Sequence, residues 1–340
     1  MSKNLTVQKS KNLRTMNSFG FDVRALYFAA PRTSEEAKMA ASEAKELNCP
    51  VLALGGGSNV LFTRDYQGLV LHPCIDGIVV MDEDEECCRI AVGAGVVWDN
   101  LVAYTVERGL GGLENLSLIP GSTGAAPVQN IGAYGAEAKD AVDSVEGFYL
   151  DDLSDFTLDK ESCRFAYRDS IFKRELKGKI LITRVVFRLS KRPAYSLSYG
   201  NLDEEIRKYG EPNLDRIRRA VIEIRRRKLP DPAELGNAGS FFKNPTVDAV
   251  KANELRAMYP DMPIFPSAEG RMKLAAGKLI EICGFKGARH GNVGVHEHQA
   301  LVLVNRGGGT PAELLELSDK IRKAVHDKFG VDIEPEVNVI

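Results

Sequence analysis

The sequence predicts an α+β fold, and three observations lead to this prediction. Short apolar strands and amphipathic helices interleave irregularly along the chain, unlike the regular alternation of a doubly wound sheet. One buried strand ends directly in a run of three glycines, Gly55–Gly57. The 340 residues are 27% charged and 44% apolar, which is typical of a folded chain with roughly two or three domains.

The first half of the chain is predicted to contain two helices among short strands. Thr33 or Ser34 caps a helix over Ser34–Leu47 with one polar face, and a second helix over Trp98–Arg108 ends at Gly109. The predicted strands are Val51–Leu54, Val60–Phe62, Leu69–Leu71, Ile78–Met81 and Arg89–Val92. Between the last two lies the acidic run 82–86, which indicates a solvated hairpin or loop.

The composition changes over residues 193–213, and the second half reads as a further domain. A basic helix over Ile217–Lys228 stops at a proline-containing segment, because proline cannot continue a helix. The other expected elements are a glycine-rich turn at Gly236–Ser240, helices at Lys273–Gly284 and Pro311–Phe329, a strand at Ala300–Val304 and an extended tail at Ile333–Ile340. Domain boundaries are expected near residue 75 and between residues 215 and 230.

Composition excludes several classes of protein. The formal charge is 45 − 47 = −2, so there is no global basic field for nucleic acid. No apolar run approaches the roughly 18 residues that a membrane helix needs, and the N-terminus has no apolar signal segment. The six cysteines have no CxxC spacing, which indicates reduced thiols of a cytosolic protein. His296–His298 lacks the spacing of HExxH, so no metal site is expected.

Three glycine-rich segments lie within roughly 80 residues, at 55–59, 93–95 and 118–135. Glycines let backbone N–H groups approach a phosphate closely. The first segment is neither a Walker A loop nor a G-x-G-x-x-G fingerprint that opens a helix. The set favours a large anionic cofactor, and the alternative is a group of tight turns in a compact domain.

Three further segments carry polar groups suited to chemistry. Arg168 offers a planar fork to a carboxylate or enolate, although an ion pair with Asp169 is the simpler interpretation. Ser240 lies on a glycine turn without the G-x-S-x-G elbow, which leaves acid catalysis or a capping role. The basic run 225–228 indicates a solvated helix end from which one side chain reaches a ligand phosphate.

Together these motifs resemble the UDP-N-acetylenolpyruvoylglucosamine reductase family (MurB), flavoenzymes of peptidoglycan precursor synthesis. The matching segments occur in the family's order over nearly the whole chain, and the segment around Tyr199 is similar to the type I subclass. They are Asn17–Gly20, LGGGSNVLF (54–62), the VGAG…W stretch (92–98), GLENLSLIPGSTGAAPVQNIGAYG (112–135), YRDSIFK (167–173), SYGNL (198–202), KLPDP…GNAGSFFKNP (228–245), KLAAGKLIEICGFKG (273–287), HEHQALVLVN (296–305) and IEPEV (333–337).

The resemblance implies an FAD-binding unit of two subdomains, of the vanillyl-alcohol oxidase (PCMH) type, and a C-terminal α+β substrate-binding domain. The implied divisions are 1–75 and 76–217 for the FAD-binding subdomains and 218–332 for the substrate domain, with strand 333–340 returning to the first subdomain. FAD is held without a covalent bond. The residues implied to bind it are Gly55, Gly56, Gly57, Ser58, Asn59, Pro120, Gly121, Ser122, Thr123, Gly124, Gln129, Asn130, Gly132 and Tyr134.

The resemblance also implies a reaction. NADPH reduces FAD, and hydride then passes to the methylene carbon of UDP-N-acetylglucosamine enolpyruvate, which gives UDP-N-acetylmuramate. Arg168 and a protonated Glu336 are implied to hold the enolpyruvyl carboxylate, where negative charge develops, while Ser240 donates the proton. The residues implied to bind the UDP half are Tyr199, Lys228, Asn244 and Gln299.

Several alternatives stay open at the level of sequence. Either Lys228 or Lys243 stabilises the Ser240 alkoxide, and Glu336 is preferred to Glu334 because it directly precedes Val337 in the family pattern. Asn338 stands where the family commonly has a basic residue.

Two other functions compete with the reductase. One is another flavin oxidase of the same fold, and the other is an inactive UDP-sugar-binding module. The inactive module predicts loss of one of Arg168, Ser240 and Glu336, and all three are present. We expect a cytoplasmic monomer that neither binds nucleic acid nor inserts into a membrane.

Overall fold

The computed structural model describes residues 6–340, and this part of the chain divides into two compact units. The first comprises the described residues up to Asn12, with Arg24–Gly57 and Asp65–Arg225; the second comprises Leu13–Val23, Ser58–Arg64 and Arg226–Ile340. Neither unit is a continuous stretch of chain. Both mix strands and helices, which confirms the α+β prediction. The predicted boundaries at residues 75, 217 and 332 stay predictions.

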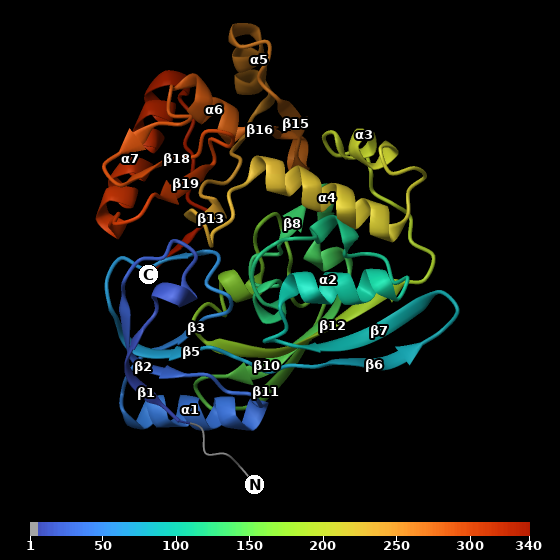
Figure 1. Cartoon of the computed structure of the whole chain (residues 1–340), viewed down its shortest axis with the longest axis vertical. Coiled ribbons are helices and arrows are strands. Elements are labelled where there is room, and N and C mark those ends of the chain that lie inside the picture. Colours follow the sequence, from blue (N-terminus) through green and yellow to red (C-terminus); the bar gives the residue numbers. More distant parts are fainter. Residues whose placement is uncertain (1–5) are drawn as a thin grey trace. The chain divides into compact units, whose positions relative to one another are not determined.

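A mixed sheet covered by α1 (Ser34–Glu46) opens the first unit (Figure 1). Its strand order is β1 (Gln8–Asn12), β2 (Arg24–Ala29), β5 (Tyr66–Leu71) and β3 (Val51–Ala53). The helix begins where predicted, because the Thr33 hydroxyl accepts a hydrogen bond from Glu36 N at 3.1 Å. Its alanine face is buried against Leu69 and Leu71.

A five-stranded antiparallel sheet forms the larger part of the first unit. Its order is β11 (Asp155–Asp159), β10 (Val142–Tyr149), β12 (Ile180–Ser190), β7 (Cys87–Gly93) and β6 (Ile78–Glu83). The predicted acidic hairpin between β6 and β7 is confirmed, because Asp84 Oδ1 accepts hydrogen bonds from Glu86 N and Cys87 N in the turn. No strand was predicted at the positions of β10, β11 and β12.

Three helices and a short hairpin complete the first unit. They are α2 (Trp98–Glu107), α3 (Leu202–Arg207), α4 (Leu214–Lys228) and the hairpin β8–β9 (Gly132–Ala133 and Ala136–Glu137). The apolar side chains of α3 and α4 form one buried cluster, which includes Leu202, Ile206, Ile217 and Ile224. The division between the two units falls within α4.

The second unit packs three helices, α5 (Ala249–Met258), α6 (Ala276–Ile282) and α7 (Pro311–Phe329), with three small sheets. The first sheet has the order β13 (Gly236–Ser240), β19 (Val302–Asn305), β18 (Val293–Val295) and β17 (Arg289–His290). The others are β14 (Thr246–Val247), β16 (Met272–Leu274) and β15 (Ile264–Pro266), and the parallel pair β20 (Asn338–Val339) and β4 (Val60–Leu61).

Two predictions for the second unit are wrong. A turn was expected at Gly236–Ser240, but these residues form strand β13, which pairs with β19. The pairing register is irregular between Asn237 and Ser240, where Gly239 lies. Gly239 has φ +67°, a conformation that suits glycine, so the glycine bends a strand here rather than ending one. The helix predicted from Lys273 begins at Ala276, because Met272–Leu274 pair with β15.

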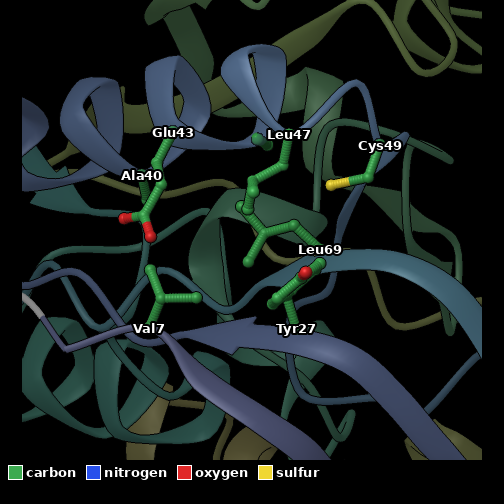
Figure 2. A pocket seen from close by; sticks show the side chains of 8 residues that line it. Val7, Tyr27, Ala40, Glu43, Leu47, Cys49 and Leu69 are labelled. Atoms are coloured by element: carbon green, nitrogen blue, oxygen red, sulfur yellow. The ribbon is translucent and has the colours of Figure 1, made fainter.

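A small pocket lies between α1 and the first sheet of the first unit (Figure 2). Its lining residues are Val7, Tyr27, Ala40, Glu43, Ala44, Leu47, Cys49 and Leu69. None of these is a predicted site residue. All six cysteines are free, and burial raises the pKa of Cys163 to about 12, so this thiol is unreactive at neutral pH. Within residues 6–340, no helix is long and apolar enough to cross a membrane.

Candidate active site

The predicted cofactor loops approach each other so closely that their glycines are required. A Cβ added to Gly55 would lie 2.6 Å from Ser122 Oγ, and one added to Gly56 would lie 2.8 Å from Gly121 Cα. Gly57, with φ +64°, turns the chain immediately afterwards. The segment after β3 and the segment 121–122 therefore lie backbone to backbone.

The glycine-rich segment 93–95 joins the same cluster. Trp98 N donates to Gly121 O at 3.0 Å, Thr123 N to Val96 O at 2.8 Å, and Gly124 N to Ala94 O at 2.9 Å. A Cβ on Gly124 would lie 2.6 Å from Ala94 Cβ. Residues 55–57, segment 93–95 and segment 118–135 thus meet within the first unit, with Pro120 exposed in the last of them.

Arg168 contacts Gly132, in the later part of segment 118–135. Its Nη2 donates to Gly132 O at 2.5 Å, and a Cβ on Gly132 would lie 2.7 Å from Arg168 Nη1. The residue has φ +54° in a tight turn between Ala166 and Asp169, whose carboxylate pairs with Arg174. This turn directs the guanidinium of Arg168 toward the Gly132–Tyr134 segment.

Asn130 ties the cofactor segment to the Arg168 turn. Its Nδ2 donates to Ala166 O at 2.9 Å and to Glu137 Oε2 at 3.1 Å, while Oδ1 accepts from Lys139 N at 3.0 Å. The side chain is fully buried and holds structure. Nearby, Ser170 Oγ donates to Val128 O at 2.6 Å, next to the half-buried Gln129. Roles for Asn130 and Gln129 toward FAD stay predictions.

Helix α4 contacts the glycine-rich segment 118–135 from one side. Arg218 forms a bidentate ion pair with Asp99, at 2.7 and 2.9 Å, and Asp99 also accepts from Leu118 N at 2.6 Å. Seven residues further along, Arg225 Nε donates to Leu118 O at 3.2 Å. Burial of Asp99 opposes ionisation, yet Arg218 and Leu118 N–H hold the pKa of its carboxyl below the ordinary value.

Arg225 belongs to the basic run 225–228, from which one side chain was expected to reach a ligand phosphate, but its guanidinium is buried and donates to Leu118 O rather than standing at a solvated helix end. Burial lowers the pKa of its guanidinium, and the nearby positive charge of Arg168 lowers it further. Two guanidinium groups therefore share one region of the first unit with Tyr134, where an anion would offset their mutual repulsion. The signal in the sequence was the seven-residue spacing from Arg218 to Arg225, which places both on one helix face.

Tyr199 lies beside Tyr134. Their rings are 6.2 Å apart and nearly perpendicular, and Tyr199 is 57% exposed. The loop that carries it also receives a hydrogen bond from the buried Asn115, whose Nδ2 donates to Ser196 O at 2.8 Å and to Tyr134 O at 2.7 Å. The structure thus joins Arg168, Tyr134 and Tyr199 in the first unit.

In the second unit, Ser240 and Glu336 lie on neighbouring segments. Ser240 ends β13 opposite Val302, and Phe241 N donates to Leu301 O at 2.7 Å. On the other side, Glu336 N donates to Phe241 O at 2.7 Å. Glu334 lies at the surface, with its side chain 74% exposed and 3.8 Å from Lys243 Nζ, whereas Glu336 is half-buried.

Asn244 and Gln299 each contact the start of α6. Asn244 Oδ1 accepts from Ala276 N at 3.0 Å, and Gln299 Oε1 lies 3.1 Å from where a Cβ on Gly277 would be. Lys228 is exposed at the end of α4. His296 is buried, which lowers its pKa, and the part of the chain that the structure describes contains no group of three potential metal ligands.

The C-terminal strand ties Ser58–Asn59 to the Glu336 segment. Asn338 N and Nδ2 both donate to Asn59 O at 3.1 Å, and Asn59 Nδ2 donates to Glu336 O at 3.4 Å. The side chain at position 338 therefore stabilises the end of the glycine segment through its amide.

The residues of the first unit fit an anionic dinucleotide such as FAD. Close approach at Gly55, Gly56 and Gly124 leaves backbone without side chains at the loops, and Arg225 supplies positive charge. Backbone N–H groups and guanidinium groups are the donors that bind pyrophosphate.

Comparisons with known proteins agree with these observations. Residues 25–151 match the family model of an FAD binding domain, and residues 231–340 match that of the UDP-N-acetylenolpyruvoylglucosamine reductase C-terminal domain. The chain is 47% identical to the UDP-N-acetylenolpyruvoylglucosamine reductase of Pseudomonas aeruginosa over 337 residues, covering 98% of this chain and 99% of the relative. It is 46% identical to that of Bacteroides fragilis over 334 residues, covering 98% and 100%.

A solved structure shows the same fold. The crystal structure of UDP-N-acetylenolpyruvylglucosamine reductase (MurB) from Thermus caldophilus superposes with a TM-score of 0.70 at 25% identity, covering 98% of this chain and 99% of that one. The resemblance found in the sequence is therefore confirmed. The chain belongs to the UDP-N-acetylenolpyruvoylglucosamine reductase family and is an FAD-dependent oxidoreductase.

Proposed function

We propose that this chain reduces UDP-N-acetylglucosamine enolpyruvate to UDP-N-acetylmuramate in peptidoglycan precursor synthesis, with NADPH as reductant. The proposal rests above all on Ser240 and Glu336, which one backbone hydrogen bond holds on neighbouring segments, Glu336 N to Phe241 O. The site residues that the family requires are all present, over nearly the full length of relatives named for this reaction. We propose that the protein acts in the cytoplasm.

The reaction adds a hydride and a proton across one carbon–carbon double bond. FAD, when bound, supplies the hydride that it has taken from NADPH. In our proposal the hydride reaches the terminal methylene carbon, and the π electrons move to the neighbouring carbon and its carboxylate. Arg168 offsets this negative charge from a fixed position, because Gly132 O and the turn at 166–169 hold its guanidinium. Glu336 is proposed to share a proton with the carboxylate.

Ser240 is proposed to donate the proton to the carbanionic carbon. A serine hydroxyl is a weak acid, so a cation must stabilise the alkoxide that forms. Lys243 Nζ lies 3.8 Å from the exposed Glu334 carboxylate, whose negative charge offsets that of the lysine. This favours Lys228 as the cation that stabilises the alkoxide. We propose that Lys228, Tyr199, Asn244 and Gln299 bind the UDP half and thereby position the reacting carbon.

The test is anaerobic stopped-flow absorbance at the flavin band, which separates the two half-reactions. NADPH should bleach the oxidised flavin, and the enolpyruvyl substrate should then restore it without oxygen. Ser240→Ala should slow only the second step, by about a hundredfold or more, because general acids contribute about 10²–10⁴-fold. Thr157→Ala, which removes an exposed hydroxyl on β11, is the matched control. Restoration of colour by oxygen alone would indicate another flavin oxidase.

A further inference from the structure

The loop over residues 191–201 joins β12 to α3 without regular secondary structure. Its first residues are anchored by Lys191, whose Nζ lies 2.8 Å from Glu83 Oε2, and by Pro193, which packs against Gly111. Its last apolar residue, Leu197, packs on the α3–α4 cluster. Between these anchors the loop is open to solvent, with Tyr195 38% and Tyr199 57% exposed.

Asn115 supplies a buried polar anchor for this loop. Its side chain is 2% exposed, and its Nδ2 uses both hydrogens on main-chain carbonyls, Tyr134 O and Ser196 O. The two acceptors are 19 and 81 residues away along the chain. One amide therefore joins the Gly132–Gly135 turn to the Tyr199 loop.

The two joined segments fit each other closely at this point. A Cβ on Gly135 would lie 3.0 Å from Ser196 Oγ and 3.6 Å from Tyr199 Cβ, and the Tyr134 and Tyr199 rings meet edge to face. Because a buried amide hydrogen without an acceptor is unfavourable, the loop does not leave this position without breaking a bond in buried surroundings. Asn115 thus opposes every movement that carries Ser196 away from the turn.

We propose that Asn115 is a positioning residue that holds the Tyr199 loop against the Gly132–Gly135 turn and so sets the affinity for the diphosphate of the substrate. This inference rests on the proposed function, in which Tyr199 binds the UDP half. Asn115 acts through the loop and not on the reacting atoms. Its loss therefore removes binding that the ground state and the transition state share, which raises KM and leaves kcat unchanged.

The first experiment measures steady-state kinetics of the holoenzyme with the enolpyruvyl substrate. Asn115→Ala should raise KM about five- to thirtyfold, the effect of about 1–2 kcal/mol of lost hydrogen bonding, with kcat within about twofold. In a Tyr199→Ala background the same change should have no further effect on KM. Asn17→Ala is the matched control, because Asn17 is also buried and donates to two carbonyls, Leu13 O and Phe21 O.

The second experiment follows the loop without using activity. Limited chymotrypsin digestion, with mass spectrometry of the products, should cut after Tyr195 or Tyr199 about five- to thirtyfold faster in Asn115→Ala than in the wild type or in Asn17→Ala. Should Asn115→Ala fail to fold, Asn115→Asp keeps the shape of the side chain and removes both donors. Equal cleavage in the variant and the wild type overturns the proposal.

The outcomes separate this inference from the proposed function. A Tyr199→Ala chain with wild-type KM contradicts the role of Tyr199 and with it the effect on affinity, while the digestion still decides whether Asn115 holds the loop. Faster cleavage of Asn115→Ala with an unchanged KM overturns the effect on affinity. A raised KM that is additive with Tyr199→Ala overturns action through the loop.

Discussion

Gly56 illustrates at the scale of one residue how the cofactor loops are built. An added Cβ would lie 2.8 Å from Cα of Gly121 and 3.3 Å from its carbonyl carbon. Both are backbone atoms, so no flexible side chain can move aside. The requirement for glycine here comes from close approach, because Gly56 lacks the positive φ of Gly57.

We expect Gly56→Ala to lose flavin while the chain stays folded. Overpacking of this kind costs about 1–3 kcal/mol, which corresponds to flavin binding weakened about ten- to a hundredfold if the loops carry the strain. The measurement is the ratio of flavin to protein absorbance after gel filtration, with circular dichroism to confirm folding.

Gly178→Ala is the control for this change. Gly178 has φ +71° and nothing within 4 Å of an added Cβ, so alanine there strains the backbone without touching the loops. It should lower stability by about 1 kcal/mol and keep a full complement of flavin. Equal flavin content in both variants would contradict a role for the Gly56–Gly121 contact.

At the scale of the element, α4 carries an arginine pair on one face. Arg218 binds Asp99 at the start of α2, and Arg225 binds Leu118 O at the entry to the 121–124 segment. The Asp99 carboxylate that binds Arg218 also accepts a hydrogen bond from Leu118 N. It therefore joins α4 to the same residue that Arg225 contacts. The helix therefore braces a cofactor loop as well as covering a hydrophobic cluster.

The lowered pKa of Asp99 makes this brace pH-dependent. A carboxyl whose pKa is lower in the folded state contributes stability above its unfolded value, here 3.8, and loses it as the pH falls through the folded value. We expect Asp99→Asn to lower the free energy of unfolding by about 2 kcal/mol at pH 7, with the difference from the wild type shrinking below about pH 4.

Urea unfolding of the wild type and Asp99→Asn between pH 3 and 7 measures that difference. Other carboxyls that titrate in this range affect both chains alike and cancel. Asp155→Asn serves as a control, because Asp155 is 72% exposed and its ion pair with Lys38 lies at the surface. A difference that stays constant down to pH 3 would show that Asp99 does not carry the effect.

At the scale of the whole molecule, the two compact units are not two consecutive stretches of the chain. The second unit takes Leu13–Val23 and Ser58–Arg64 from the first quarter of the sequence. Phe19, Phe21 and Leu61 are at most 2% exposed and belong to the same core cluster as Phe241, Leu303 and Val337. Strand β20 pairs with β4 from this early part.

We therefore expect a fragment of residues 226–340 not to fold by itself. Truncating one buried phenylalanine costs about 3–5 kcal/mol, so loss of Phe19, Phe21 and Leu61 together exceeds most of the 5–15 kcal/mol that stabilises a typical domain. The measurement is the thermal transition and amide chemical-shift dispersion of the fragment beside the full chain. A cooperative transition in the fragment would contradict this expectation.

Helices α1, α2, α4 and α7 and the nature of the site were predictable because their signals are local, whereas α3 and α5 were not predicted. Thr33 caps α1, and Thr310 with Glu313 forms a capping box at the start of α7, as short-range patterns indicate. The β10–β11 hairpin pairs locally and was missed nonetheless, whereas β12 was missed because its partner β7 lies far away in sequence. The turn predicted at Gly236–Ser240 was wrong for the same reason, since pairing with β19 outweighs the local preference of two glycines.

The sequence by itself determined the family, the α+β class and the glycine segments, because each of these depends on residue identity and short spacing. Only the tertiary structure decided which side chains meet. Arg225 and Leu118 are 107 residues apart, and Asn338 and Asn59 are 279 apart. Such contacts follow from how sheets and helices pack, and a single sequence carries no local signal for them. That is why only the folded chain distinguishes Arg225 within the basic run 225–228 and points to Asn115 as a positioning residue.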